Sequence, residues 1–127
     1  TAGQNGQFRT PRHIIKMMVD MVEPKKEDSI CDPACGAAGF LVAAGEYIHE
    51  KHDDWFLDPK FRKHYNSDMF TGIEFDATML RIAAMNLQLH GIENPNLIGK
   101  DALSENNGDL RDAYTLILAN PPFKGSL

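Results

Sequence analysis

The stretch that decides the fold is DSICDPACGAAGF, residues 28–40. Its first part predicts a short strand from Ser29 to Asp32, which Pro33 ends. The segment CGAAGF then predicts a tight turn that opens a helix. The buried stripe of that helix is expected to consist of Phe40, Leu41, Ala44, Tyr47 and Ile48.

Strands and helices continue to alternate after this unit. MFTGIE predicts a second strand, NLIG a third and YTLILA a fourth, which is apolar along most of its length, as expected of a strand covered on both faces. Asp76 can cap a helix that Gly91 ends. The alternation predicts an α/β fold with a parallel sheet and right-handed crossovers. The residues expected to line the helix after Asp76 are Met79, Leu80, Ala83, Met85, Leu87 and Leu89.

Two further segments complete the chain. Thr10 as N-cap and Pro11 as the first helical residue predict a helix over residues 10–23, which Pro24 ends. Residues 51–68 lose the helical period and mix aromatic with charged residues, so we expect a loop or a short helix inserted on the surface. The apolar face of the first helix is expected to consist of Ile14, Met17, Met18, Met21 and Val22.

Composition limits the class of protein. The 127 residues are enough for one domain with a core, and no stretch approaches the roughly 20 apolar residues of a membrane span. The two cysteines are too few for a disulfide framework or a cysteine-only metal site, which favours a reducing, cytosolic setting and no metal. The net charge of -5 indicates that most phosphate contacts of a nucleic-acid partner would lie elsewhere. The first residue is Thr rather than Met, so we expect a processed or excised piece.

Acidic residues follow three successive strands, and ligands of parallel sheets bind beyond the carboxyl ends of strands. Asp32 precedes a turn with Gly36 and Gly39, and its carboxylate would repel a pyrophosphate but favour an ammonium or sulfonium group. Glu74 could accept hydrogen bonds from ribose hydroxyls, and Asp101 from an adenine amino group. Taken alone, the glycine turn after Asp32 could be a tight turn without a ligand. Glu74 could be a solvated acid, and Asp101 a capping residue. Together they predict one shared crevice for a nucleoside that carries positive charge.

The fourth strand runs into NPPF, residues 120–123. An exocyclic amine of a base is a poor nucleophile, and an enzyme can help by accepting both of its hydrogens. Asn120 offers an amide oxygen and Pro121 a backbone carbonyl, in a turn that the prolines keep stiff. Phe123 could stack on a base taken out of its helix. The alternative is a proline-terminated strand followed by a core aromatic residue.

The motifs GQFRTP, DPACGAAGFL, GIEFD, GKDAL and NPPF, in this order, resemble the adenine-specific DNA methyltransferases that use S-adenosylmethionine. RIAAMNLQLHGI, residues 81–92, is similar to a stretch typical of the modification subunit of type I restriction-modification systems. The resemblance covers nearly the whole chain except residues 51–68. It implies a Rossmann-like methyltransferase fold truncated after the fourth strand, with strands ordered 3-2-1-4, and methyl transfer to adenine N6 in DNA.

The resemblance also implies the site. Phe8, Thr10 and Pro11 match a segment that packs over the methionine part of the cofactor, and Ala38 stands where the family usually has a glycine. The implied catalytic residues are the tetrapeptide Asn120, Pro121, Pro122 and Phe123. The implied residues that bind S-adenosylmethionine are Phe8, Thr10, Pro11, Asp32, Pro33, Gly36, Gly39, Glu74 and Asp101.

The resemblance further implies how the chain relates to an intact enzyme. Residues 1–127 would be a partial catalytic domain, with an N-terminal helix over 10–23 and a cofactor-binding half over 28–127. A helical domain before it and a region after it would be missing, leaving strand four as an open edge and the fragment inactive alone. The implied partners are DNA, through the intact complex, and the specificity and restriction subunits, with no membrane and no metal.

Two other functions remain open from the residues. A protein-glutamine N5-methyltransferase also uses Asn-Pro-Pro on a flat amide, although GQFRTP and residues 81–92 argue against it. A nucleotide-binding module without catalysis would need only the cofactor half of the site.

Overall fold

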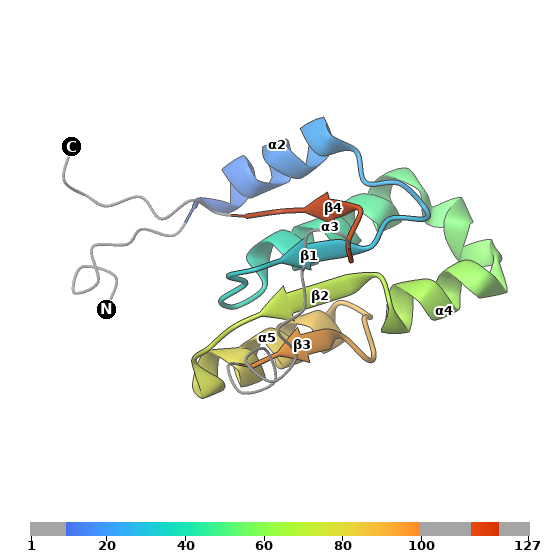
Figure 1. Ribbon diagram of the computed structural model, residues 1–127. Helices are drawn as coiled ribbons and strands as arrows, with labels where there is room; N and C mark the ends of the chain where they lie inside the picture. The colour runs from blue at the N-terminus through green and yellow to red at the C-terminus, as the bar shows by residue number, and fades with distance from the viewer. Residues whose placement is uncertain (1–9, 100–112, 120–127) are drawn as a thin grey trace.

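The computed structural model describes residues 10–99 and 113–119. Its four strands form one parallel sheet in the order β3-β2-β1-β4 (Figure 1), which confirms the predicted fold class and strand order. The register places Cys31 opposite Thr71 on one side and Ile117 on the other. The strands are β1 (Ile30–Asp32), β2 (Phe70–Ile73), β3 (Asn96–Ile98) and β4 (Leu116–Ile117).

The described helices are α2 (Arg12–Val22), α3 (Gly39–Lys51), the 3-10 helix η1 (Asp53–Leu57), α4 (Pro59–Ser67) and α5 (Ala77–Leu89). Helix α3 packs against β1, β2 and α2, and α5 also contacts α3. Buried side chains from α2, α3, α4 and α5 join those of the sheet in one cluster, so these helices share one core. The predicted stripe of α3 is confirmed, with Phe40, Leu41, Ala44 and Ile48 buried and Tyr47 partly buried.

Helix α2 begins later than the sequence pattern predicts. Pro11 has non-helical backbone angles (φ -57°, ψ 146°) and is the N-cap residue, so Thr10 is not the cap. The carbonyl of Pro11 accepts hydrogen bonds from the N–H groups of Ile14 and Ile15, which are the first bonds of the helix. Proline therefore stands before the first turn rather than inside it.

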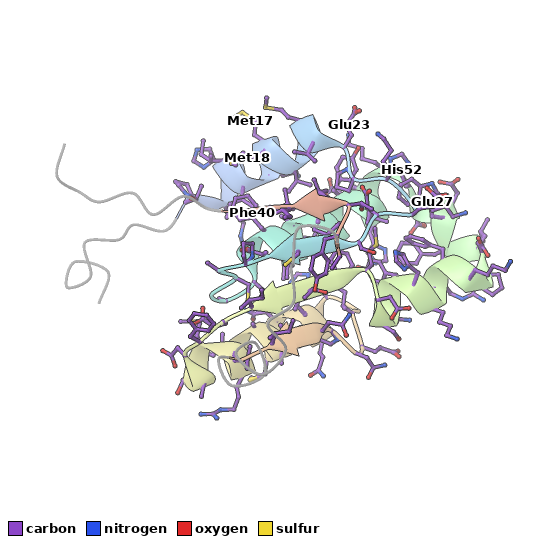
Figure 2. The ribbon with its side chains drawn as sticks, in the orientation of Figure 1. Met17, Met18, Glu23, Glu27, Phe40 and His52 are labelled. Carbon is purple, nitrogen blue, oxygen red and sulfur yellow. The ribbon has the colours of Figure 1, made fainter. Side chains whose placement is uncertain are left out.

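The apolar face predicted for α2 is only partly the buried one. Val19 is fully buried, and Ile15 and Met18 pack against the core. Met17 and Met21 are 51% and 76% exposed (Figure 2 labels Met17 and Met18). The helix carries apolar residues on more than one side, and periodicity does not distinguish which side meets the sheet.

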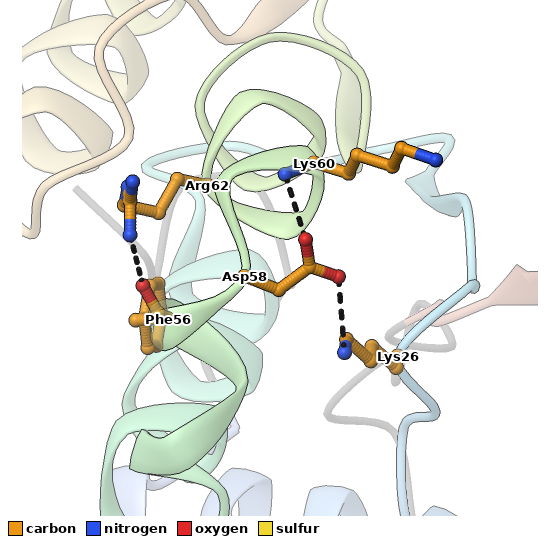
Figure 3. A network of polar contacts seen from close by, with 5 residues as sticks. All are labelled: Lys26, Phe56, Asp58, Lys60 and Arg62. Carbon is orange, nitrogen blue, oxygen red and sulfur yellow. Dashed lines mark hydrogen bonds and ion pairs between the residues drawn. The ribbon is translucent and has the colours of Figure 1, made fainter.

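Residues 51–68 contain short helices, as one of the two expected forms, but they are not confined to the surface. The segment holds η1 and α4, and Phe61 and Tyr65 of α4 are buried in the core cluster. Asp58 caps α4 by accepting the N–H of Lys60 at 2.9 Å and pairs with Lys26 at 3.3 Å (Figure 3). Two buried aromatic residues four positions apart in a nine-residue helix are too few to show a period among charged neighbours.

Helix α5 is capped as predicted, since Asp76 accepts hydrogen bonds from the N–H groups of Thr78 and Met79. Gly91 follows the helix with φ +86°, as a C-terminal stop requires. Only part of its predicted apolar lining is buried. Ala83 and Leu87 are buried, Met79 and Leu80 are partly buried, and Met85 and Leu89 are exposed.

Strand β4 is shorter than the predicted YTLILA strand and is not covered on both faces. Ile117 is 46% exposed, whereas Leu118 just beyond it is buried against the core. The start of the strand is tied to β1, because Thr115 Oγ1 accepts the N–H of Ser29 at 2.8 Å and donates to Asp28 at 2.8 Å. Within the described residues β4 is an edge strand.

Candidate functional site

The sheet brings two of the predicted acidic residues to the same edge. β1 ends at Asp32, which is in register with Gly72, two residues before Glu74. The structure also describes Thr10, Pro11, Pro33, Gly36 and Gly39 among the predicted site residues. The predicted site residues outside the described ranges are Phe8, Asp101, Asn120, Pro121, Pro122 and Phe123.

The turn after β1 is held by backbone hydrogen bonds. Asp32 Oδ1 accepts the N–H of Ala34 at 3.0 Å, and the N–H of Ala38 donates to the carbonyl of Cys35 at 2.7 Å. Cys35 in turn donates its N–H to the carbonyl of Ile73 at the end of β2. Gly36 has φ +53°, a left-handed conformation that glycine adopts without strain. The turn is therefore attached to the second strand as well as the first.

Glu74 makes a second link between the end of β2 and the turn after β1. Its Oε1 accepts the N–H of Gly36 at 3.1 Å, and its Oε2 accepts the N–H of Asp76 at 2.8 Å. The carboxylate is half-buried, and its orientation is fixed by these two bonds. Each carboxylate oxygen has a second lone pair, so hydroxyl groups of a ligand can still donate to it.

Asp32 is a buried carboxylate, 1% exposed. Burial raises its pKa from 3.8 to about 6; the hydrogen bond from Ala34 opposes this rise, and the charge of Glu74 adds to it. None of the ion pairs among the described residues involves Asp32. A buried carboxylate without a cationic partner is suited to a ligand that brings the positive charge.

The two thiols next to the acids are not nucleophiles. Burial, and secondly the charge of Asp32, raise the pKa of Cys31 to about 11 and that of Cys35 to about 12. Both thiols therefore stay protonated at neutral pH. Over residues 10–99 and 113–119, no group of three His, Cys, Asp or Glu residues is arranged to hold a metal ion. No helix in the same ranges is long and apolar enough to cross a membrane.

The amino end of α3 lies directly after the turn. Its N-cap residue is Ala38, whose left-handed backbone (φ +72°, ψ 31°) is unusual for a residue other than glycine. Among the described residues no side chain caps this helix end. Gly39 lies against α2, since a Cβ atom at this position would be 3.5 Å from Ile15 Cδ1.

Two residues that the sequence analysis did not select also lie at this site. Phe75 follows Glu74 and is 59% exposed, which makes it available to a flat ring. Asn86, on α5, donates from Nδ2 to the carbonyl of Ala37 in the turn at 2.9 Å. An aromatic residue next to an acid at a strand end was a usable signal for Phe75. No local pattern marks the contact of Asn86, which joins residues 49 positions apart.

Two cavities formed by described residues lie away from Asp32 and Glu74. One, of about 490 Å³, is lined by residues that include Ser29, Asp68 and Pro95, which precede β1, β2 and β3. The other, of about 380 Å³, includes Lys25, Tyr47 and other residues between α2 and η1. Neither of these two cavities contains Asp32 or Glu74.

Comparison with known proteins gives one family. The family described as N-6 DNA Methylase matches residues 1–126. The methylase subunit of the type I restriction enzyme EcoEI from Escherichia coli is 33% identical over 127 residues, which are 99% of this chain and 25% of that protein. The chain thus spans about a quarter of the length of this relative.

Solved structures agree with the sequence comparison. The crystal structure of the type I restriction enzyme EcoKI M protein superposes with a TM-score of 0.79 at 28% identity, over 96% of this chain and 26% of that chain. The structure of SMU.472, a putative methyltransferase complexed with SAH, superposes with a TM-score of 0.57 at 18% identity, over 96% of this chain and 38% of that chain. The second likeness is one of fold alone.

Proposed function

This chain belongs to the N-6 DNA methylase family, and from this premise we propose that it is the cofactor-binding part of an adenine-specific DNA methyltransferase. The reaction is transfer of a methyl group from S-adenosylmethionine to adenine N6 in DNA, by the modification subunit of a type I restriction-modification system. The observation that carries the proposal is the buried Asp32, with no cationic partner among the described residues, beside Glu74 at the carboxyl edge of the sheet.

The residues at this edge fit the proposed cofactor. Asp32 is suited to the cationic amino acid part, because a positive ligand group would compensate its buried charge. Glu74 has free lone pairs for the ribose hydroxyls, and Phe75 offers an exposed ring for the adenine. When bound, S-adenosylmethionine supplies an activated methyl group on its sulfonium, so the protein needs no strong acid and no metal. Asp101, Phe8, Thr10 and Pro11 stay predictions as cofactor contacts, as do Pro33, Gly36 and Gly39.

The catalytic part of the proposal rests on the position of β4. β4 pairs with β1, and the N–H of Leu118 donates to the carbonyl of Cys31 at 2.9 Å, directly before Asp32. The chain therefore leaves β4 beside the acidic edge, two residues before Asn120. We assign Asn120 and the carbonyl of Pro121 to the adenine amino group and Phe123 to the stacked base, in a turn stiffened by Pro122.

The proposal extends to the organisation of the enzyme. Residues 1–127 form a partial catalytic domain, with the first helix, α2, over Arg12–Val22 and the cofactor-binding half over 28–127. DNA binding and site recognition belong to the intact complex, with its specificity and restriction subunits, which fits the net charge of -5 on this chain. Two buried free cysteines suit a reducing, cytosolic setting.

Calorimetry and a methylation assay test the proposal in the intact protein. S-adenosylmethionine should bind, NAD should not, and labelled methyl groups should appear on adenine N6 of duplex DNA. Asp32→Ala should lose both the binding of S-adenosylmethionine and methyl transfer, because the Asp32 carboxylate holds the cofactor. Transfer to a glutamine-containing peptide instead of DNA, or tight NAD binding without a response to S-adenosylmethionine, would replace this function by one of the two alternatives.

A further inference from the structure

Asn86 lies in RIAAMNLQLHGI, residues 81–92, the stretch with no role in the proposed function. Asparagine is a weaker helix former than alanine, because its side chain competes with the backbone for hydrogen bonds. In α5 the side chain is half-buried and donates to the carbonyl of Ala37, 2.9 Å away in the turn after β1. The contact therefore links α5 to the turn of the candidate site.

The acceptor belongs to one particular peptide group, that between Ala37 and Ala38. Its carbonyl accepts from Asn86 at 2.9 Å, and its N–H donates to the carbonyl of Cys35 at 2.7 Å. Both polar ends of this peptide group are thus held. Rotation of this group changes φ of Ala38, so the two bonds together fix that angle.

Ala38 is where fixing this angle matters most. Its φ of +72° is a left-handed value, which is strained for an L-residue with a Cβ atom. Ala38 is also the N-cap residue of α3, so its conformation sets how the helix leaves the turn. Without a bond at Ala37, the peptide group can rotate and relieve the strain, and the turn loses its shape.

We propose that Asn86 is a positioning residue for the cofactor, holding the Ala37–Ala38 peptide group so that the turn is formed before the cofactor binds. This inference rests on the proposed function, because the turn is taken to be part of the S-adenosylmethionine site. Asn86 itself touches neither cofactor nor substrate. Its loss should weaken cofactor binding and leave the turnover of bound cofactor nearly unchanged, since the bound cofactor restores the turn.

The test compares Asn86→Ala with wild type in the intact protein. S-adenosylmethionine should bind about three- to tenfold more weakly, the range of one hydrogen bond, with KM raised to match and kcat within about twofold. In the unliganded variant, amide exchange at Ala38 should be faster, relative to that of Leu41 within α3. Gln88→Ala on the same helix is the matched control, because the Gln88 side chain is exposed and donates to the carbonyl of Glu93 rather than to the turn.

A second substitution separates positioning from a general loss of stability. Adding Ala38→Gly to Asn86→Ala should recover part of the cofactor affinity, because glycine adopts a left-handed φ without strain. The inference is overturned if Asn86→Ala has wild-type affinity for S-adenosylmethionine and wild-type amide exchange at Ala38. It is also overturned if the double variant recovers no cofactor affinity. If the wild-type protein does not bind S-adenosylmethionine, the proposed function and this inference are both overturned. If the wild type binds it and Asn86→Ala binds it equally well, this inference alone is overturned.

Discussion

The carboxylate of Glu74 and the backbone N–H of Gly36 are joined by a hydrogen bond of 3.1 Å, which connects the end of β2 to the turn after β1. A second bond, from the N–H of Asp76, fixes the other oxygen of the same carboxylate. The acid proposed to bind ribose is therefore also a structural link between the two halves of the site. Substitutions at this edge should affect ligand binding and the unliganded fold in separable ways.

Asp32→Asn should stabilise the unliganded protein at neutral pH. The pKa of Asp32 is raised to about 6 in the folded protein from 3.8 when unperturbed, so the native state binds this proton more tightly than the unfolded state does. Stability is therefore lost as pH rises from about 4 through 6, by on the order of 1–3 kcal/mol. Asparagine removes the charge and can still accept from Ala34. Urea unfolding at pH 4 and pH 7.5 should show a gain for the variant only at the higher pH.

The same residue predicts a pH dependence of cofactor binding. A protonated Asp32 cannot compensate a cationic ligand, so the affinity of the wild type for S-adenosylmethionine should fall as pH drops below about 6. Asp32→Asn should bind weakly at every pH, with this part of the dependence removed. Calorimetric titrations between pH 5 and 8 measure the affinity of both proteins for S-adenosylmethionine. A wild-type affinity that rises toward low pH would contradict the role given to this carboxylate.

Glu74→Ala should weaken cofactor binding before it affects the chemical step. Loss of hydrogen bonds from ligand hydroxyls to a charged group predicts an affinity about ten- to a hundredfold lower. Glu74→Gln is the control, because its amide oxygen can still accept one bond, and its loss should be smaller. Equal effects of the two variants on the dissociation constant would argue against a hydrogen-bonding role.

Asn120→Ala in the intact protein should slow the chemical step and leave cofactor binding nearly unchanged. Removing one acceptor of the adenine amino group predicts a kcat lower by about a hundredfold or more, by analogy with other transition-state hydrogen bonds. The dissociation constant of S-adenosylmethionine should stay within about threefold of wild type. Single-turnover methylation and calorimetry measure the two quantities, and a parallel loss of both would count against the division of roles.

Gly72→Ala should destabilise the fold by about 1–3 kcal/mol, the usual effect of overpacking. A Cβ atom at Gly72 would be 2.8 Å from Cys35 Sγ and 3.1 Å from Leu97 Cδ2. Adding Cys35→Ala should recover part of the loss, because the nearest atom is removed. Gly99→Ala is the control, with its Cβ in ordinary contact 3.5 Å from Leu80, and should stay within about 0.5 kcal/mol of wild type. Urea unfolding of Gly72→Ala, Cys35→Ala, the double variant and Gly99→Ala tests this; additive effects of the two single changes in the double variant would show that the sulfur is not the obstacle.

The sequence was sufficient for the order of the strands and for the placement of Asp32 and Glu74 at their carboxyl ends. Proline and glycine mark the end of β1 and the turn after it, and parallel topology then places Asp32 and Glu74 at one edge. These predictions depend on turn residues that can be recognised in short segments and on the general rule that ligands bind beyond the carboxyl ends of parallel strands.

The sequence did not predict which helical residues are buried, because tertiary packing decides this. The exposed Met17 and Met21 on α2, and Met85 and Leu89 on α5, are apolar residues at helical spacing that the sheet does not reach. Conversely, α4 is buried through Phe61 and Tyr65 in a segment whose composition indicated the surface. The bond of Asn86 depends on how α5 lies on the turn, which no window of the sequence contains.

The polar bonds that shape the turn, from Asp32, Ile73, Glu74 and Asn86, all arise from one continuous stretch of the chain between residues 32 and 86. β4, by contrast, joins β1 across a separation of 86 residues, through Ser29 and Thr115. Since closing a longer loop costs more entropy and slows folding, the nascent chain emerging from the ribosome can order the turn first and add β4 last. The half of the site proposed for the methyl donor would then take shape during synthesis, ahead of the half proposed for the base.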